Sequence, residues 1–464
     1  LLFELGAGAV PLLSARYERE HGAAGTQVQR GTLSWRSERP DWPARGVQGH
    51  FALGDIDLQA WERWADGLGL GAATTEAHRA YWPTDFGVSA ERVRHGGRQF
   101  HDLVAGGARD GDNWRLSLAA RELNGYVEYR PGSVASPGRV YARLARLTLP
   151  PSGASEVEAL LQGQPRFVPA LDVVVDDFEL NGRRLGRLEI DAVNRQASLS
   201  AQEAVREWRL NTLNLTVPEA RLQASGNWAL PGGARDGAAR RTALKVNLQI
   251  DDAGALLARF GMPDVVRGGK GTLGGTVGWI GSPLALDVPS LSGELQLDLQ
   301  RGQFLKADPG LAKLLGVLSL QSLPRRLALD FRDIFSEGFA FDFVRGNARI
   351  AQGVASTNNL QMKGVSAAVL LEGRADIARE TQDITSVGIP ELNAGTAALI
   401  ATAINPVTGL GTFLAQFLLR QPLQAAATQE FRITGPWADP QVEKVNRRNI
   451  PNEEGAPSRP GAQP

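Results

Sequence analysis

Between Leu291 and Ile350, apolar and polar residues alternate over a longer stretch than one half-buried strand occupies. From Leu291 to Gln300, Leu or Gly takes every second position and a polar residue takes each position between. Side chains in a strand point alternately to opposite faces, so each run places an apolar row on one face of a sheet and a polar row on the other. The chain is therefore predicted to be mainly β, and its function depends on what the apolar face covers.

The same alternation recurs along the chain and predicts a series of strands joined by short turns. Asn181-Gly182 lies between two such runs and is typical of a two-residue hairpin turn. A one-residue change of phase between Leu210 and Leu213 predicts a β-bulge. Consecutive hairpins predict an antiparallel sheet. The residues expected on its apolar face are Val173, Val175, Leu188, Ile190, Leu213, Leu215, Leu244, Val246, Leu248, Leu295, Leu297, Leu329, Phe339, Phe341 and Phe343.

Three short helices are expected to interrupt the strands. Asp57 can cap a helix near residues 57–66, and Asp252 can cap a similar helix near residues 252–260. Both helices are followed by glycine, which favours helix termination. Asp308 and Pro309 begin a third helix, near residues 309–322, that would cap the sheet.

No charged residue occurs from Leu392 to Leu419. Asn405-Pro406 and Gly409 divide this stretch into halves of about ten residues, whereas a membrane-spanning helix needs about 20. A helical hairpin over residues 391–428 is expected instead, either packed on the sheet or lying at a membrane surface, with a true span as the remaining alternative. The residues expected to contact a membrane are Ile400, Ile404, Leu410, Phe413, Leu414, Phe417 and Leu418.

The 464 residues are enough for two or three domains or for one elongated sheet. The predicted organisation is a β region over residues 1–390, the helical hairpin over 391–428, a last strand within 429–445 and a disordered tail over 446–464. Fifty basic residues balance fifty acidic ones, so nucleic acid is not an expected partner. The chain has no cysteine, which excludes disulfides and thiolate metal sites.

The sequence lacks motifs for catalysis or for cofactor binding. Residues 269–274 match the glycine pattern of a dinucleotide-binding loop, but a predicted helix precedes them and a strand follows, the reverse of what phosphate binding needs. The spacing of the five histidines matches no metal signature, and only His95 and His101, beside Asp102, merit a test. No nucleophile has an obvious base beside it. The sequence therefore predicts neither an enzyme nor a cofactor.

Several separated blocks of sequence resemble the C-terminal region of the YhdP branch of the AsmA-like proteins. They are residues 325–342, the Asn-Pro-Val-Thr-Gly block at 405–409 and the Thr-Gly-Pro-Trp-Ala-Asp-Pro block at 434–440. Trp42, Trp61 and the helix that Asp252 caps are also similar. These blocks follow the family's order and extend over nearly the whole chain.

The resemblance implies a long, curved, open β-groove in the Gram-negative envelope that carries phospholipid across the periplasm between the inner and outer membranes. It also implies an inner-membrane anchor N-terminal to this sequence and contact between residues 392–419 and the outer membrane. Envelope proteins would be further partners, and no cofactor would be needed. No catalytic motif comes with the resemblance.

Periodicity alone favours a different interpretation. Most sheets with one apolar face pack against a second layer, so the same rows would form the closed core of a non-catalytic β-repeat scaffold or adhesion protein. An envelope hydrolase is a third class, and it lacks the motifs that it would need. The lipid-transport hypothesis therefore requires an apolar face that no second protein layer seals.

Overall fold

The computed structural model describes 15 stretches of the chain: residues 1–5, 12–22, 25–67, 80–95, 98–132, 137–149, 168–198, 204–230, 239–283, 286–305, 339–364, 367–390, 409, 411–414 and 428–445. The chain divides into two compact units. Unit 1 comprises Leu1–Pro263 and Lys270–Leu295, and unit 2 comprises Asp264–Gly269 and Gln296–Pro464.

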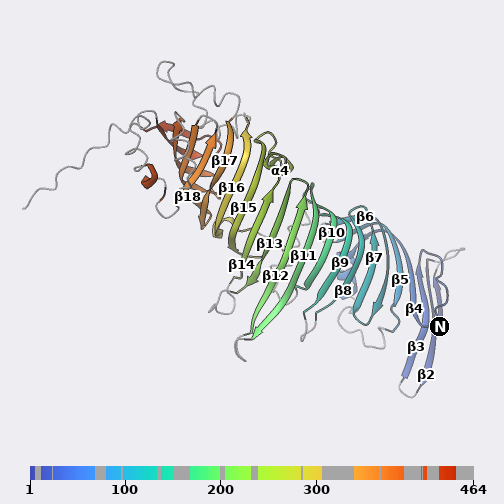
Figure 1. Ribbon diagram of the computed structural model, residues 1–464. Coiled ribbons are helices and arrows are strands. Elements are labelled where there is room, and N and C mark those ends of the chain that lie inside the picture. The colour runs from blue at the N-terminus through green and yellow to red at the C-terminus, as the bar shows by residue number, and fades with distance from the viewer. Residues whose placement is uncertain are drawn as a thin grey trace, which may run out of the picture. The chain divides into compact units, whose positions relative to one another are not determined.

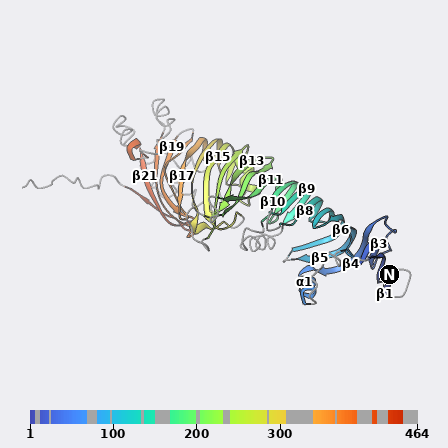
Figure 2. The ribbon, with the colours of Figure 1, turned by 90° about the horizontal axis from the view of Figure 1, so that it is seen from below.

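Strands dominate both units, and the 22 strands belong to one sheet. Within each unit the sheet is curved and open rather than closed into a barrel, which confirms the predicted mainly β architecture (Figures 1 and 2). Fourteen strands lie wholly in unit 1: β1 (Leu2–Leu5), β2 (Leu13–Gly22), β3 (Gly25–Trp35), β4 (Gly46–Asp57), β5 (Asp85–His95), β6 (Arg98–Asp110), β7 (Asn113–Ala119), β8 (Leu123–Arg130), β9 (Arg139–Leu149), β10 (Ala170–Leu180), β11 (Arg183–Ser198), β12 (Ala204–Val217), β13 (Ala220–Ala229) and β14 (Arg241–Ile250).

Two strands have residues in both units, and six lie wholly in unit 2. The two are β15 (Val266–Ile280) and β16 (Ser292–Phe304). Unit 2 contains β17 (Phe339–Ala351), β18 (Val354–Gly364), β19 (Ala367–Asp376), β20 (Thr381–Pro390), β21 (Gln429–Pro436) and β22 (Gln441–Lys444). Residues 429–445, expected to hold one last strand, therefore hold two.

Alternation explains why these segments are strands. In β14, Leu244, Val246 and Leu248 are half-buried, while Lys245 and Asn247 between them are exposed. One face of the strand is thus removed from water and the other is solvated, which is the arrangement that a period of two produces.

The described pairing is mainly antiparallel, as predicted, but three of the described pairs are parallel: β3 with β4, β4 with β5, and β9 with β10. Long connections precede the second strand of each pair, over residues 36–45, 58–84 and 150–169. A parallel pair needs such a connection because the chain must return to the same end of the sheet, whereas a two-residue turn can join only antiparallel strands.

Local predictions at turns, bulges and helix starts are confirmed. Asn181 and Gly182 have φ angles of 54° and 74°, as a type I′ hairpin turn requires. The register between β12 and β13 shifts between Leu210 and Leu213.

The two α-helices that are described over their whole length, α1 and α4, begin at the predicted caps. In α1 (Leu58–Gly67), the backbone N–H of Ala60 donates to Asp57 Oδ1 at 3.0 Å. In α4 (Ala253–Arg259), the N–H of Ala255 donates to Asp252 Oδ1 at 2.9 Å. α1 lies beside β5 (Figure 2), and a short 3-10 helix, η2 (Val288–Ser290), precedes β16. The expected third helix near residues 309–322, the run around Leu329, most of residues 391–428 and the tail over 446–464 lie outside the described residues.

Candidate functional site

An unbroken apolar row crosses the sheet of unit 1. Each residue of this row is the register partner of the next, on the neighbouring strand, from β1 to β15. Partners in register point to the same face of a sheet. The row is Phe3, Ala15, Leu33, Gly49, Phe86, Gly107, Leu116, Val127, Ala142, Val173, Ile190, Leu213, Ala224, Val246 and Gly275. No polar residue interrupts it.

A second apolar row runs beside the first, two residues away on each strand and therefore on the same face. It is Leu5, Leu13, Trp35, Phe51, Val88, Ala105, Leu118, Gly125, Leu144, Val175, Leu188, Leu215, Leu222, Leu248 and Leu273. We call the two rows together the apolar face of unit 1.

The row between these two points to the other face and has a different composition. It is Glu4, Ser14, Ser34, His50, Gly87, Gly106, Ser117, Tyr126, Arg143, Val174, Glu189, Asn214, Gln223, Asn247 and Gly274. Val174 is its single large apolar member. The sheet of unit 1 is therefore amphipathic across fifteen consecutive strands.

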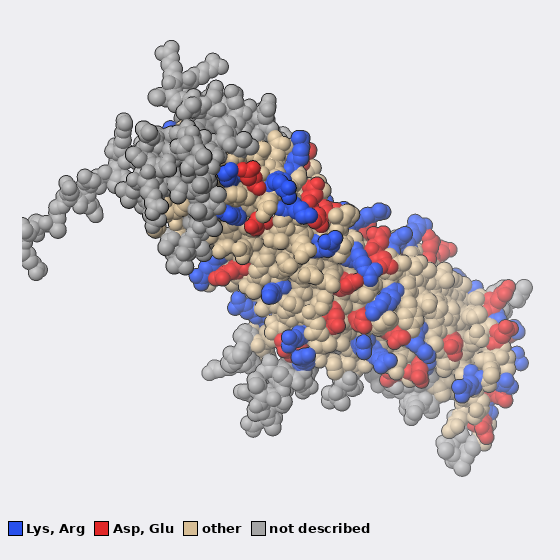
Figure 3. All heavy atoms as spheres, viewed as in Figure 1, with Lys and Arg blue, Asp and Glu red and all other residues tan. Residues whose placement is uncertain are grey.

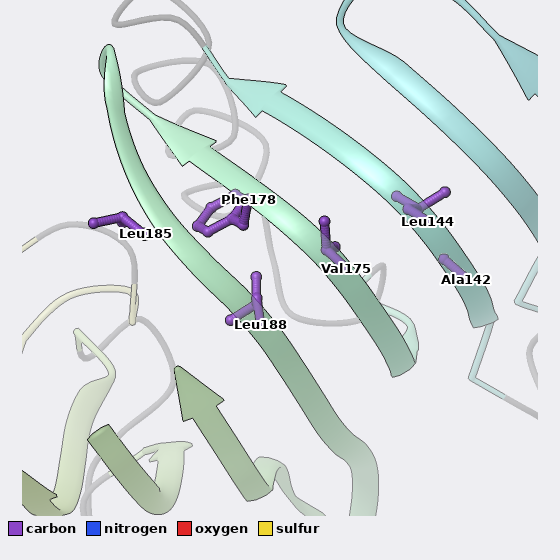
Figure 4. Close-up of a cluster of buried hydrophobic side chains, with 6 residues drawn as sticks. All are labelled: Ala142, Leu144, Val175, Phe178, Leu185 and Leu188. Atoms are coloured by element: carbon purple, nitrogen blue, oxygen red, sulfur yellow. The ribbon is translucent and has the colours of Figure 1, made fainter. Parts of the chain in front are cut away.

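The centre of the apolar face is a packed cluster on β9, β10 and β11. Figure 4 shows its six buried side chains: Ala142, Leu144, Val175, Phe178, Leu185 and Leu188. Val175 is 0% exposed, whereas Val173, Ile190 and Leu213 beside it are only half-buried. A neighbouring cluster continues the face through Ala192, Trp208, Leu210 and Trp228. The face is thus continuous, and part of its area stays accessible.

Ion pairs and hydrogen bonds cover the opposite, polar face. Arg143 donates to Asp172 at 2.7 Å, and Asn214 donates to Glu189 at 3.2 Å. Hydrogen bonds from Asn214 and Arg187 lower the pKa of Glu189, so this carboxylate stays ionised. Lys and Arg side chains lie among Asp and Glu side chains over the surface seen in Figure 3. This mixture of signs gives no single-sign field that would attract a polyanion.

The described strands of unit 1 make their main contacts with their neighbours in the sheet. All described strands also belong to that one sheet, so the described part of the chain contains no second sheet to cover the apolar face. A closed β-sandwich, the alternative that periodicity alone favours, needs two sheets.

The structure brings most of the predicted lining residues together in unit 1. Val173, Ile190, Leu213 and Val246 lie in the first row, and Val175, Leu188, Leu215 and Leu248 lie in the second. Leu244 shares their face, because it pairs with Gly226 and Val277, two residues further along each strand. Leu295 lies next to Gly275, where an added Cβ would approach the Leu295 Cα to 2.9 Å.

The remaining lining residues belong to unit 2. Phe339 and Phe341 are each 3% exposed, and Phe341 packs against Phe304 with ring centroids 5.0 Å apart and the rings tilted. Leu297 is half-buried. Leu329 lies outside the described residues.

Phe343 departs from the predicted row of phenylalanines. The register pairs Phe341 with Gly364 but Phe343 with Lys363, the adjacent residue of β18, so the two rings point to opposite faces. The cause is a bulge between Phe341 and Phe343, which changes the phase of the strand. Arg345 covers the Phe343 ring at 4.2 Å from its centroid. No feature of the sequence marks this bulge.

Two of the predicted membrane-contact residues are described; both belong to the helical residues 411–414 and lie against β19 and β20. Leu414 is 6% exposed and packs in a cluster with Ala368, Leu370, Val387 and Ile389, and Phe413 packs against this cluster. The other five, Ile400, Ile404, Leu410, Phe417 and Leu418, lie outside the described residues. None of the described helices has the length and apolar character that a membrane crossing requires.

The described histidines do not form a metal site. His101 Nδ1 lies 2.6 Å from Glu122 Oε1, while Asp102 accepts a hydrogen bond from Arg121 at 2.7 Å. In the described part of the chain, no three His, Asp or Glu side chains lie close enough together to hold a metal ion. Residues 269–274, which match the letters of a dinucleotide loop, lie inside strand β15.

Comparison with known proteins assigns the chain to a family. The family model described as YhdP protein matches residues 5–442. The chain is 31% identical over 230 residues to the intermembrane phospholipid transporter YhdP of Escherichia coli (strain K12). That match covers 49% of this chain and 18% of the relative, so the chain corresponds to a small part of that protein. No solved structure gives a significant match. By the extent of the family match, this chain belongs to the YhdP protein family.

Proposed function

We propose that this chain forms part of a conduit that carries phospholipid between the inner and outer membranes of a Gram-negative envelope. The observation that carries the proposal is the apolar face of unit 1, two rows with no polar interruption across β1 to β15. A continuous apolar surface that stays partly accessible is unusual on a soluble protein and marks a binding site for an apolar partner. Acyl chains are the occupants that the relative's transport of phospholipid suggests.

The tails of a phospholipid are costly to expose to water. Exposing two acyl chains of ~32 methylene groups in total to water costs roughly 25 kcal/mol at ~0.8 kcal/mol per group. The two rows place an apolar residue on every strand from β1 to β15, so a lipid that moves along them keeps its tails out of water. The polar face carries ion pairs and faces the periplasm. Such a mechanism needs no catalytic group and no cofactor.

The experiment measures phospholipid that copurifies with the protein without detergent, by mass spectrometry. Val246→Asp places a charge in the first apolar row, and Asn247→Asp places the same charge on the polar face one residue away. We expect the Val246→Asp protein to lose most of its bound lipid and the Asn247→Asp protein to retain it. Lipid-free wild-type protein, or equal lipid content in both variants, contradicts the proposal.

We further propose that the charge-free segment contacts the surface of the outer membrane, with Leu414 fixing it to the sheet. Charged residues are absent from Leu392 to Leu419, and Phe417 continues the helical spacing of Phe413 and Leu414. In liposome flotation, Phe417→Asp should reduce binding, whereas Gln416→Asp, which adds the same charge off the apolar stripe, should not. Equal flotation of both variants would assign the whole segment to the sheet.

A further inference from the structure

Residues 81–84, directly before β5, lie on the apolar face of unit 1, and we call them the strap. The Tyr81 ring packs edge-on against the ring of Tyr17 on β2, with centroids 5.1 Å apart. Tyr17 points to the apolar face because Ala15, two residues before it on the same strand, belongs to the first apolar row. The strap therefore reaches from β5 across to β2 over that face.

The strap also occupies the first apolar row at β4. Gly49 is the member of that row on β4, and a Cβ added to it would lie 2.8 Å from Pro83 Cγ. Apolar carbon atoms in contact lie about 4 Å apart, so an acyl chain does not fit between Pro83 and the strand. Leu33, the neighbour of Gly49 in the row, lies on β3, between the two strands that the strap contacts. An acyl chain on the first row therefore cannot cross β3 and β4 while the strap is in place.

The two ends of the strap are held in different ways. The Thr84 N–H donates to Val47 O at 2.8 Å, and the Val47 N–H donates to Thr84 Oγ1 at 3.1 Å, so this end is fixed to the backbone of β4. Side chains hold the other end. Tyr17 Oη donates to Tyr81 O at 3.0 Å, and Arg19 Nη1 donates to Tyr81 Oη at 3.4 Å, which is long for a hydrogen bond. The strap can therefore turn about Thr84 once the contacts of Tyr81 are lost.

Burial beneath the strap couples its movement to lipid. Tyr17 is only 8% exposed and Gly49 is buried, whereas Trp82 of the strap is 54% exposed. Moving the strap away without a substitute would expose apolar area at both positions to water, which is unfavourable. An acyl chain that takes its place keeps this area buried. Lipid therefore favours the open position of the strap, and its absence favours the closed position.

We propose that the strap is a gate in the conduit, closing the first apolar row over β2 to β4 until an acyl chain displaces it. In the closed position, the Tyr81 ring lies against Tyr17 and Pro83 lies over Gly49. In the open position, the first row is accessible without a break from β1 to β15. The inference rests on the proposed function and adds to it a point at which the passage of lipid is controlled.

The first experiment captures phospholipid at a chosen position. A photo-reactive diazirine residue replaces either Leu33, in the section that the strap closes, or Leu213 on β12, outside it. Phospholipid cross-linked from vesicles of phosphatidylethanolamine and phosphatidylglycerol is quantified by mass spectrometry. We expect weaker capture at Leu33 than at Leu213 in the otherwise wild-type chain. Tyr17→Phe removes the hydroxyl that donates to Tyr81 and should raise capture at Leu33 by about fivefold, the factor that one ordinary hydrogen bond gives.

The matched control is Tyr129→Phe, which removes a hydroxyl from the same face at β8, outside the strap. Capture at Leu33 should stay as in the wild type. The second experiment locks the gate. Because the chain has no cysteine, a short thiol-specific cross-linker can join only the two new thiols in the double variant Tyr17→Cys, Tyr81→Cys. Cross-linking should abolish capture at Leu33 and leave capture at Leu213 as it is in the same protein before cross-linking.

The two positions separate the gate from the conduit. Strong capture at Leu213, with capture at Leu33 that responds neither to Tyr17→Phe nor to the cross-link, overturns the gate and leaves the conduit. Equal capture at the two positions in the otherwise wild-type chain also overturns the gate. The absence of capture at both positions in every variant refutes the conduit, and the gate with it.

Discussion

Strands β10 to β14 of unit 1 and the β19–β20 hairpin of unit 2 bury their side chains in different ways. In β14, buried or half-buried residues alternate with exposed ones along the whole strand. In β19, four consecutive residues, Ala367 to Leu370, are all buried. The first pattern belongs to a sheet with one solvated face, and the second belongs to a strand that is covered on both faces. Leu414 supplies part of the second cover.

This difference indicates where the sheet is rigid and where a ligand can enter. Side chains that are buried on both faces lose any space for a lipid tail, whereas the half-buried rows of β10 to β14 retain accessible apolar area. The proposed conduit is therefore expected to hold its cargo along strands such as β12 rather than along the fully buried part of the β19–β20 hairpin.

The largest expected effect tests this contrast directly. Leu370→Ala removes a side chain that is 0% exposed and should lower the local stability of β19–β20 by about 2–5 kcal/mol, because a cavity remains. Leu213→Ala on the half-buried face should cost only about 1 kcal/mol. Hydrogen exchange measured peptide by peptide gives both values. Equal losses at the two sites would remove the distinction between the regions.

The second prediction concerns how helices attach to the sheet in the two units. In unit 2 the contact through Leu414 is apolar, whereas α4 in unit 1 is held by Arg259, which pairs with Glu219, a residue only 7% exposed. Arg259→Ala leaves that carboxylate buried without its partner and should cost about 1–3 kcal/mol at neutral pH. Urea unfolding monitored by hydrogen exchange in α4 measures the loss.

The stability lost in Arg259→Ala is expected to be smaller at acidic pH than at neutral pH. The hydrogen bond from Arg259 lowers the pKa of Glu219 in the folded protein. The ionised Glu219 therefore contributes its full stabilisation above the unfolded-state pKa of about 4.3. This stabilisation is lost as the pH falls through the lower pKa of the folded state. The difference between wild type and Arg259→Ala should shrink on acidification. A difference that stays constant from neutral pH down to acidic pH would show that the ion pair does not hold α4.

The third prediction tests the turn that sets the register between β10 and β11, within the region whose rows stay open. Gly182 has a positive φ and open space around it, so Gly182→Ala adds backbone strain of about 1–2 kcal/mol without a clash. Gly106→Ala is the matched control, because Gly106 has equally open surroundings without a positive φ. Thermal unfolding should show a lower midpoint for the first variant alone.

The smallest effect is expected on the polar face of unit 1. Arg187 pairs with Asp176 and Glu189, and all three side chains are well exposed. Arg187→Ala should cost less than about 1 kcal/mol, because solvent screens exposed ion pairs. Leu188→Ala, one residue away on the apolar face, should cost several times more by the same hydrogen-exchange measurement. Similar costs at the two neighbours would mean that both faces contribute equally to stability.

The sequence predicted the faces of unit 1 well. Val173, Ile190, Leu213 and Val246 were expected on one face from alternation within separate strands, and the structure joins them through register partners. The bulge at Leu210 to Leu213 was also visible, as a change of phase. The bulge beside Phe343 could not be predicted, because apolar residues on both sides of it are compatible with either alternation of faces.

An open cavity in unit 2, lined by Glu372, Asp383 and Glu430 together with Arg374 and Arg432, could not be found from the sequence. Its charged side chains come from β19, β20 and β21, and none of them stands in a recognisable motif. Glu430 lies 58 residues beyond Glu372, and only the pairing of β20 with both neighbours brings them together. The sequence also did not predict the three parallel pairs. The residues of a long connection do not indicate at which end of the sheet the next strand begins.

By itself, the sequence determined which residues form strands, which face of each strand is apolar, where Asp57 and Asp252 cap helices and where Asn181 and Gly182 turn the chain. These properties depend on backbone geometry over a few residues, so they can be read locally. The tertiary structure alone decided that fifteen strands align their apolar residues into two unbroken rows, that Leu414 covers one face of β19–β20, and that three acids and two arginines line one cavity. Register and packing join residues far apart in the chain, and their free energies depend on partners that no local pattern specifies.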